Sequence, residues 1–205
     1  MRVAIIGSQN SGKSHLIQEF LDKWSMYKTP EKTYRDIIKS RNIKINQEGD
    51  ETSQKTILNA LIDEVQQAQG DFLIFDRCVV DNIAYTLWLN AHDKVSDKFV
   101  MDSKFLALQT LKMFDILFYI PLREEIKIEE KDNRDTDPEF RKEIDNIFKA
   151  LVLSYEKGTG AFFPTEDCPA VITLDGPPDI RCEQIRLYLK DNGKFFTDED
   201  GSLLS

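Results

Sequence analysis

Apolar residues along the chain fall into two kinds of pattern. Short uninterrupted runs rich in β-branched and aromatic residues predict buried strands, at residues 2–6, 72–75, 116–120 and 170–174. Apolar stripes with a spacing of three or four residues predict amphipathic helices, at residues 14–24, 52–68, 80–90, 97–113, 138–155 and 179–190. Because strands and helices alternate, we expect an α/β fold with a parallel sheet covered by helices on both faces.

Two stretches are less regular. Tyr27 and its neighbours predict a short strand stopped by Pro30, and a helix is predicted from Thr29-Pro30-Glu31 to near Arg41, with Thr29 as its cap. At the other end, residues 191–205 are polar and predict a loose tail. Residues 1–190 are long enough to form one domain with a sizeable core.

One junction between a predicted strand and a predicted helix carries a phosphate-binding motif. Residues 7–14 read Gly-Ser-Gln-Asn-Ser-Gly-Lys-Ser, which is G-x-x-x-x-G-K-[ST]. Glycines let the backbone turn tightly, so that N–H groups and the helix N-terminus surround a phosphate. We expect Lys13 to reach the β- and γ-phosphates of ATP and Ser14 to bind Mg²⁺. The expected nucleotide-binding residues are Gly7, Ser8, Asn10, Ser11, Gly12, Lys13, Ser14 and His15, with an exposed helical position as the alternative for His15.

A carboxylate and a guanidinium follow the apolar run at residues 72–75. Asp76 stands at the carboxyl end of that predicted strand, where open α/β sheets bind their ligands. It could organise Mg²⁺ together with Ser14, or accept a proton from an attacking hydroxyl. Arg77 suits a phosphate or an acceptor group. The alternative is an aspartate that simply ends a strand.

A charged stretch at about 123–137 predicts a lid. We expect Arg134 to act from this lid, because its surroundings predict a loop, whereas Arg141 and Lys142 begin the next helix. A lid arginine would exclude water and neutralise charge on a transferred group. The alternative is a solvated surface loop. The expected catalytic residues are therefore Lys13, Asp76, Arg77 and Arg134.

An acceptor pocket is expected between the first helix and the strand that ends at Asp76. The residues placed there by the pattern are Glu31, Tyr34, Arg35 and Gln54, each with an exposed helical position as its alternative. Asp81 could cap the helix that follows Asp76 or point into the site.

Composition narrows the classes of partner. A net charge of −9 disfavours nucleic acid without excluding it, since a local groove could still bind it, and disfavours anionic membranes too. Three widely spaced cysteines, no apolar run near 18 residues and a phosphate loop that begins at residue 7 predict a cytoplasmic protein without a membrane span. A homodimer stays open.

The motifs resemble those of P-loop kinases of nucleosides and nucleotides. Asp76, Arg77, Asp81 and Tyr85 form D-R-x-x-x-D-x-x-x-Y, which is similar to the AAA-type ATPase/kinase family that includes the nicotinamide riboside kinase domain of bacterial NAD regulators. Thymidylate kinases share the Asp-Arg pair and the lid. The resemblance covers about residues 1–190 and implies a three-layer α/β fold with ATP and Mg²⁺. It further implies a small nucleoside or nucleotide acceptor, although the lid is unusually acidic.

Three functions are compatible with these features. The first is a kinase that transfers the γ-phosphoryl group of ATP to a small nucleoside or nucleotide. The second is a kinase of a modified base in DNA, which the net charge disfavours. The third is an ATPase or nucleotide-dependent switch without a small-molecule acceptor. The Asp76-Arg77 pair and the lid favour transfer over switching.

Overall fold

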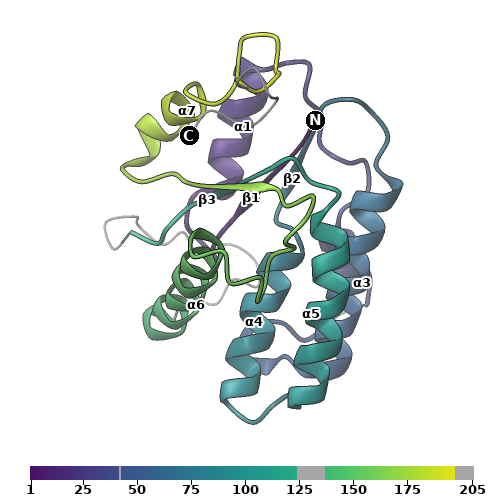
Figure 1. Cartoon of the computed structure of the whole chain (residues 1–205). Coiled ribbons are helices and arrows are strands. Elements are labelled where there is room, and N and C mark those ends of the chain that lie inside the picture. Colours follow the sequence, from purple (N-terminus) through teal and green to yellow (C-terminus); the bar gives the residue numbers. More distant parts are fainter. Residues whose placement is uncertain (42, 124–136, 197–205) are drawn as a thin grey trace.

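In the part of the chain that the structure describes, four parallel strands form the centre of the molecule in the order β2-β1-β3-β4 (Figure 1). The computed structural model of the chain describes residues 1–41, 43–123 and 137–196. The strands are β1 (Arg2–Ile6), β2 (Leu73–Asp76), β3 (Ile116–Tyr119) and β4 (Ala170–Thr173). All four were predicted from the apolar runs, and the parallel sheet is confirmed.

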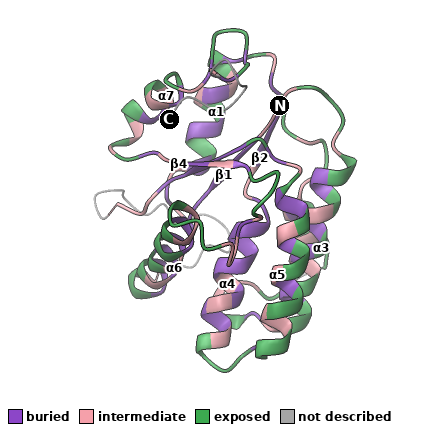
Figure 2. Ribbon diagram, viewed as in Figure 1, coloured by how far each residue is buried: buried purple, intermediate pink, exposed green. Residues whose placement is uncertain are grey.

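Helices cover both faces of this sheet. In chain order they are α1 (Lys13–Lys23), α2 (Tyr34–Arg41), α3 (Glu51–Gln67), α4 (Val79–Ala91), α5 (Asp97–Leu111), α6 (Pro138–Glu156) and α7 (Pro178–Ile185). Side chains of β1 alternate between the faces: Ala4 and Ile6 pack towards α3, α4, α5 and α6, whereas Val3 and Ile5 pack towards α1 and α7. The buried strands with helices on either side are seen in Figure 2. The α/β layering predicted from the sequence is therefore present.

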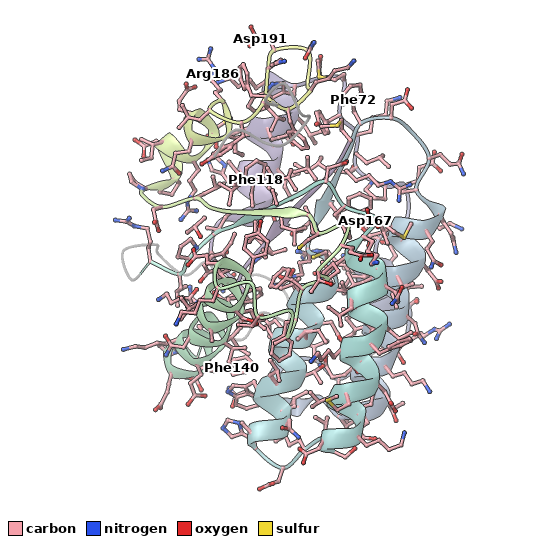
Figure 3. The ribbon with its side chains drawn as sticks, in the orientation of Figure 1. Phe72, Phe118, Phe140, Asp167, Arg186 and Asp191 are labelled. Carbon is pink, nitrogen blue, oxygen red and sulfur yellow. The ribbon has the colours of Figure 1, made fainter. Side chains whose placement is uncertain are left out.

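Aromatic side chains fill both interfaces. On one side, Phe140 of α6 packs edge-on against Trp88 of α4, with ring centroids 4.7 Å apart (Figure 3). On the other, Phe118 of β3 lies 6.3 Å from the ring of Tyr188, just beyond α7. Among the helices that the structure describes, none combines the length and the apolar character needed to cross a membrane.

Helix starts follow the local capping chemistry, with one correction. Asp50 caps α3 through the N–H of Ser53, and Asp137 caps α6 ahead of Pro138. The prediction that α2 begins at Thr29-Pro30 was wrong, because the helix begins at Tyr34. There the N–H of Tyr34 donates to Glu64 of α3 at 2.8 Å. This tertiary contact adds to a local one, in which the side chain of Asp36 accepts from the N–H of Thr33 at 2.9 Å.

Tyr27, which follows α1, contacts residues that follow α7. The predicted short strand is reduced to an isolated bridge between Lys28 and Leu73. The Tyr27 hydroxyl donates to the carbonyl of Gly193 at 2.7 Å, and Phe195 is buried at 7% exposure. Residues 191–196 of the expected tail thus pack onto the core, and residues 197–205 lie outside the described residues.

Tyr27→Phe tests this attachment. The substitution removes the hydroxyl and leaves the buried Gly193 carbonyl without its donor. We expect the free energy of unfolding to fall by about 1–2 kcal/mol, measured by urea unfolding. Tyr188→Phe is the matched control, because its hydroxyl makes no hydrogen bond to the described residues. Equal stabilities of the two variants would contradict the attachment.

Candidate active site

The loop between β1 and α1 has a backbone that ordinary residues adopt with difficulty. Gly7 and Gly12 have φ angles of 144° and 95°, in a region where side chains are strained. A Cβ at Gly7 would lie 2.5 Å from the carbonyl oxygen of Ile120, which follows β3. The two glycines of the motif therefore let the loop lie directly against the carboxyl end of the sheet.

Lys13 turns back onto this loop. Its ammonium donates to the carbonyls of Gly7 at 2.8 Å and Ser8 at 2.5 Å, and to the Ser11 hydroxyl at 3.3 Å. The side chain is 5% exposed. Burial, and then the charge of Arg77, lower the pKa of the Lys13 ammonium well below its ordinary value. An anion placed beside this cation would therefore be bound strongly.

Three arginines from other elements also bind carbonyls of the loop. Arg141 of α6 donates to the carbonyls of Gln9 and Asn10, both at 3.3 Å. Arg181 of α7 donates to the carbonyl of Ser11 at 2.8 Å. Arg77, after β2, donates to the carbonyl of Gly7 at 3.3 Å. Every carbonyl from residue 7 to residue 11 thus accepts from a cationic side chain.

Because the carbonyls of the loop are bound in this way, its backbone N–H groups are oriented so that they can bind a phosphate chain. In a trans peptide the N–H points opposite to the C=O, so each bound carbonyl directs the N–H of the next residue away from the cations. The backbone N–H groups of Ser8, Ser11 and Gly12 make no hydrogen bond to the residues that the structure describes. Such a row of oriented N–H groups at a helix N-terminus suits an anion. The predicted role of the loop residues accordingly stays consistent with their geometry.

Asp76 lies next to the loop at the end of β2, in register with Ile5 of β1. One carboxylate oxygen accepts from Arg35 of α2 at 2.6 Å. The other, Oδ1, is buried and has no hydrogen-bond partner among the described residues. A buried carboxylate oxygen without a donor suits a metal ion or an acceptor hydroxyl.

Arg77 and Asp81 form a buried pair beneath the loop. Arg77 donates to Asp81 at 2.8 Å and lies 5.7 Å from the centre of the Tyr85 ring. Its φ of 85° is unusual for a residue with a side chain. Asp81 also accepts from the N–H of Cys78 at 3.1 Å and of Gly7 at 3.4 Å. Asp81 therefore helps to cap α4, which was one of the two alternatives considered for it, and it also contacts the loop.

Only some of the residues expected to bind the acceptor lie beside Asp76. Tyr34 and Arg35 lie beside Asp76, whereas Glu31 is exposed. Gln54 is buried in a network of its own, where its side-chain oxygen accepts from Asn82 at 2.8 Å. Tyr34 and Arg35 thus remain candidates for the acceptor side, and Gln54 is held by the packing of α3 against α4.

The metal and lid predictions stay predictions. Ser14 and His15 are exposed on the first turn of α1, and His15 lies 3.4 Å from Glu19. In the described part of the chain there is no cluster of three or more His, Cys, Asp or Glu side chains suited to a metal. Mg²⁺ in phosphate sites needs only one or two carboxylates besides phosphate oxygens, so Ser14 and Asp76 fit. Arg134 lies outside the described residues, as does most of the expected lid.

Two contributors to the loop were missed by sequence reasoning. Arg181 was not considered, and Gln9, whose side-chain oxygen accepts from the Tyr85 hydroxyl, was left out of the nucleotide set. Arg181 had a detectable signal, because it is four residues before the buried Ile185 on the apolar stripe of α7. Arg141 occupies a similar position on α6 beside Phe140. A cation on a buried stripe indicates an internal acceptor.

Solved structures of other proteins share this fold. NadR protein in complex with NR is similar with a TM-score of 0.61 and 15% identity, over 94% of this chain and 48% of that one, so the chain spans about half the length of NadR. Deoxyadenosine kinase from M. mycoides has a TM-score of 0.61 and 16% identity, over 91% and 97%. Thymidylate kinase from Candida albicans has a TM-score of 0.59 and 18% identity, over 96% and 97%.

The fold and the loop define a P-loop protein with a nucleoside/nucleotide kinase-like fold. The model of the AAA domain family matches residues 2–157, and the chain belongs to that family. No curated protein matches the chain.

Glu64, which holds the start of α2, makes the stability of the protein pH-dependent. Its side chain is 8% exposed, and burial raises the pKa of Glu64 to about 7, although the bond from Tyr34 opposes this. The ordinary pKa is 4.5. Because the folded pKa is the higher one, the contribution to stability is complete below about pH 4.5 and is lost as the pH rises to about 7. The loss is on the order of 3 kcal/mol.

Glu64→Gln should remove this pH dependence. The amide that replaces the carboxyl group cannot ionise, but its oxygen can still accept from the N–H of Tyr34. Relative to the unchanged protein, we expect the variant to gain stability between about pH 4.5 and 7 and no further above that. Urea unfolding at several pH values measures the difference, with the exposed Glu31→Gln as control. Parallel pH profiles for Glu64→Gln and the unchanged protein would refute the assignment.

Proposed function

We propose that the protein is an ATP-dependent phosphotransferase that moves the γ-phosphoryl group to a small nucleoside or nucleotide. The observation that carries the proposal is the carboxylate of Asp76, which stands beside the phosphate loop with one buried oxygen free of any donor in the described chain. In a hydrolytic switch such a carboxylate would serve the metal ion alone, whereas here Arg35 of α2 also pairs with it and offers a cation to an acceptor. The names of the similar structures, which are those of deoxyadenosine and thymidylate kinases, support the same reading.

We assign the binding of the phosphate donor to the loop. Its oriented N–H groups would bind the phosphate chain, and Lys13 would exchange its carbonyl partners for phosphate oxygens. When bound, Mg²⁺ supplies charge neutralisation on the phosphates, and Ser14 and Asp76 are the residues that would hold it. Catalysis in this class is mainly positioning and electrostatic stabilisation.

We assign the binding and orientation of the acceptor to Asp76 and Arg35. In this arrangement Arg35 pairs with Asp76 at 2.6 Å and neutralises it. An acceptor that carries an anionic group would draw Arg35 away, which frees the carboxylate to orient the attacking hydroxyl or to organise the metal ion. A net charge of −9 supports a small acceptor over a nucleic acid. We place the reaction in the cytoplasm, as expected from the sequence.

The direct test uses γ-labelled ATP and Mg²⁺ with a panel of acceptors. The panel contains nucleosides, deoxynucleoside monophosphates, nicotinamide riboside and duplex DNA with a modified base. We expect label on a nucleoside or nucleotide, and a loss of about a hundredfold or more in Lys13→Ala, because that variant lacks the main cation of the loop. Label on DNA would instead favour the modified-base kinase, and label released only as free phosphate would favour an ATPase or switch.

Asp76→Asn separates acceptor chemistry from donor binding. The amide keeps the shape but cannot take a proton or hold a metal ion as a carboxylate does. We expect kcat to fall by about 10²–10³-fold while the Kd for ATP, measured by calorimetry, stays within a few-fold. Asp63→Asn, on the exposed side of α3, is the control. A pure loss of ATP affinity would assign Asp76 to the donor site.

A further inference from the structure

Arg181 is the most deeply buried arginine of the loop region. It lies on α7, which packs against α1 on one face of the sheet, and its side chain is 1% exposed. It stands on the buried stripe of α7 together with Ile185. Arginine is seldom fully buried unless it is paired with an anion, so its position calls for an explanation.

No carboxylate accounts for this burial. Nη1 of Arg181 donates to the carbonyl of Ser11 at 2.8 Å. Nε and Nη2 are buried and have no hydrogen-bond partner in the described residues, and no ion pair forms with Arg181 there. Burial, and then the charge of Arg123, lower the pKa of Arg181. A buried cation beside another cation is costly for the fold.

The other two arginines of the loop differ in this respect. Arg77 is paired with Asp81 at 2.8 Å. For Arg141, burial lowers the pKa of the guanidinium, and nearby Tyr85 and Asp145 oppose this by favouring the protonated form. Arg181 is therefore the arginine whose charge the described chain leaves uncompensated. An anionic ligand at the loop would compensate it.

Arg181 can influence a backbone N–H on the ligand side of the loop, because it binds the carbonyl of the same peptide group. The Ser11 carbonyl and the Gly12 N–H belong to the same peptide, and Gly12 caps the N-terminus of α1. A hydrogen bond to the carbonyl from a charged donor polarises the peptide and strengthens the N–H as a donor. A Cβ at Gly12 would meet Nη1 at 3.0 Å, so the guanidinium also limits how the loop can shift.

We propose that Arg181 is a positioning residue for the polyphosphate chain of the donor nucleotide. It holds the Ser11–Gly12 peptide with its N–H towards the phosphates, and its uncompensated charge adds to the positive field that the chain enters. This inference rests on the proposed function, and it assigns to α7 a part in donor binding. Because the base and sugar are not involved, the ligand chemistry recognised is a polyphosphate.

The test compares Arg181→Met with Arg181→Lys. Met removes the charge and the donor but keeps much of the volume, whereas Lys keeps the charge. Arg186→Met is the matched control, since Arg186 follows α7 and is half-exposed. Calorimetry measures the Kd of each protein for ATP, inorganic tripolyphosphate and AMP, and thermal unfolding without ligand measures Tm.

We expect Arg181→Met to weaken binding of ATP and of tripolyphosphate by the same factor, about tenfold or more, with little change for AMP. Its Tm should stay level or rise, because replacing an uncompensated buried cation with an apolar side chain is neutral or stabilising. Arg181→Lys should recover part of the affinity, and Arg186→Met should match the unchanged protein.

Other outcomes overturn the inference in distinguishable ways. Equal polyphosphate affinity of Arg181→Met and the unchanged protein refutes it and leaves the proposed function standing. A variant that fails to fold, or that has a much lower Tm with equal losses for ATP and AMP, shows a purely structural role. Absence of ATP binding by the unchanged protein overturns the proposed function and this inference together.

Discussion

The bonding of five successive loop carbonyls by cationic side chains determines how the rest of the site is arranged. Lys13 comes from the loop itself, but Arg77, Arg141 and Arg181 come from β2, α6 and α7 regions that are far apart in the sequence. Their meeting point is the carboxyl edge of the sheet, next to β1. The sheet order brings these regions together, so the fold and the site are set by the same constraint: the loop must present N–H groups, not carbonyls, to its ligand.

Charge is distributed unevenly between the two sides of the loop. The chain is acidic overall, with a net charge of −9, yet the loop is surrounded by cations. On the side of Asp76, Arg35 and Arg77 each have a carboxylate partner, in the pairs Arg35–Asp76 and Arg77–Asp81. On the α7 side Arg181 has no such partner in the described chain. Under the proposed function, the donor side is thus ready for an anion, while the acceptor side must exchange one ion pair for another.

Local patterns predicted most of the fold and the motif residues of the site. Apolar runs located β1 to β4, and the strand–loop–helix context located the phosphate loop and Asp76. The start of α2 was misplaced because the local cap formed by Thr33 and Asp36 was overlooked, and because Glu64, thirty residues away, binds the N–H of Tyr34. The role of Arg181 depends on α7 reaching Ser11 across the fold, a contact that no sequence window contains. Side chains that act through distant backbone groups have no local signature beyond an arginine on an apolar stripe.

The most direct measurement is a pair of crystal structures, one without ligand and one with Mg²⁺ and a non-hydrolysable ATP analogue. We expect the backbone of residues 7–12 and the contacts of Arg141 and Arg181 to be the same in both structures. Only the Lys13 ammonium should move, from the carbonyls of Gly7 and Ser8 to the phosphates. A loop that rebuilds its backbone on binding, or an analogue bound away from residues 7–14, would contradict a site that is formed before its ligand arrives.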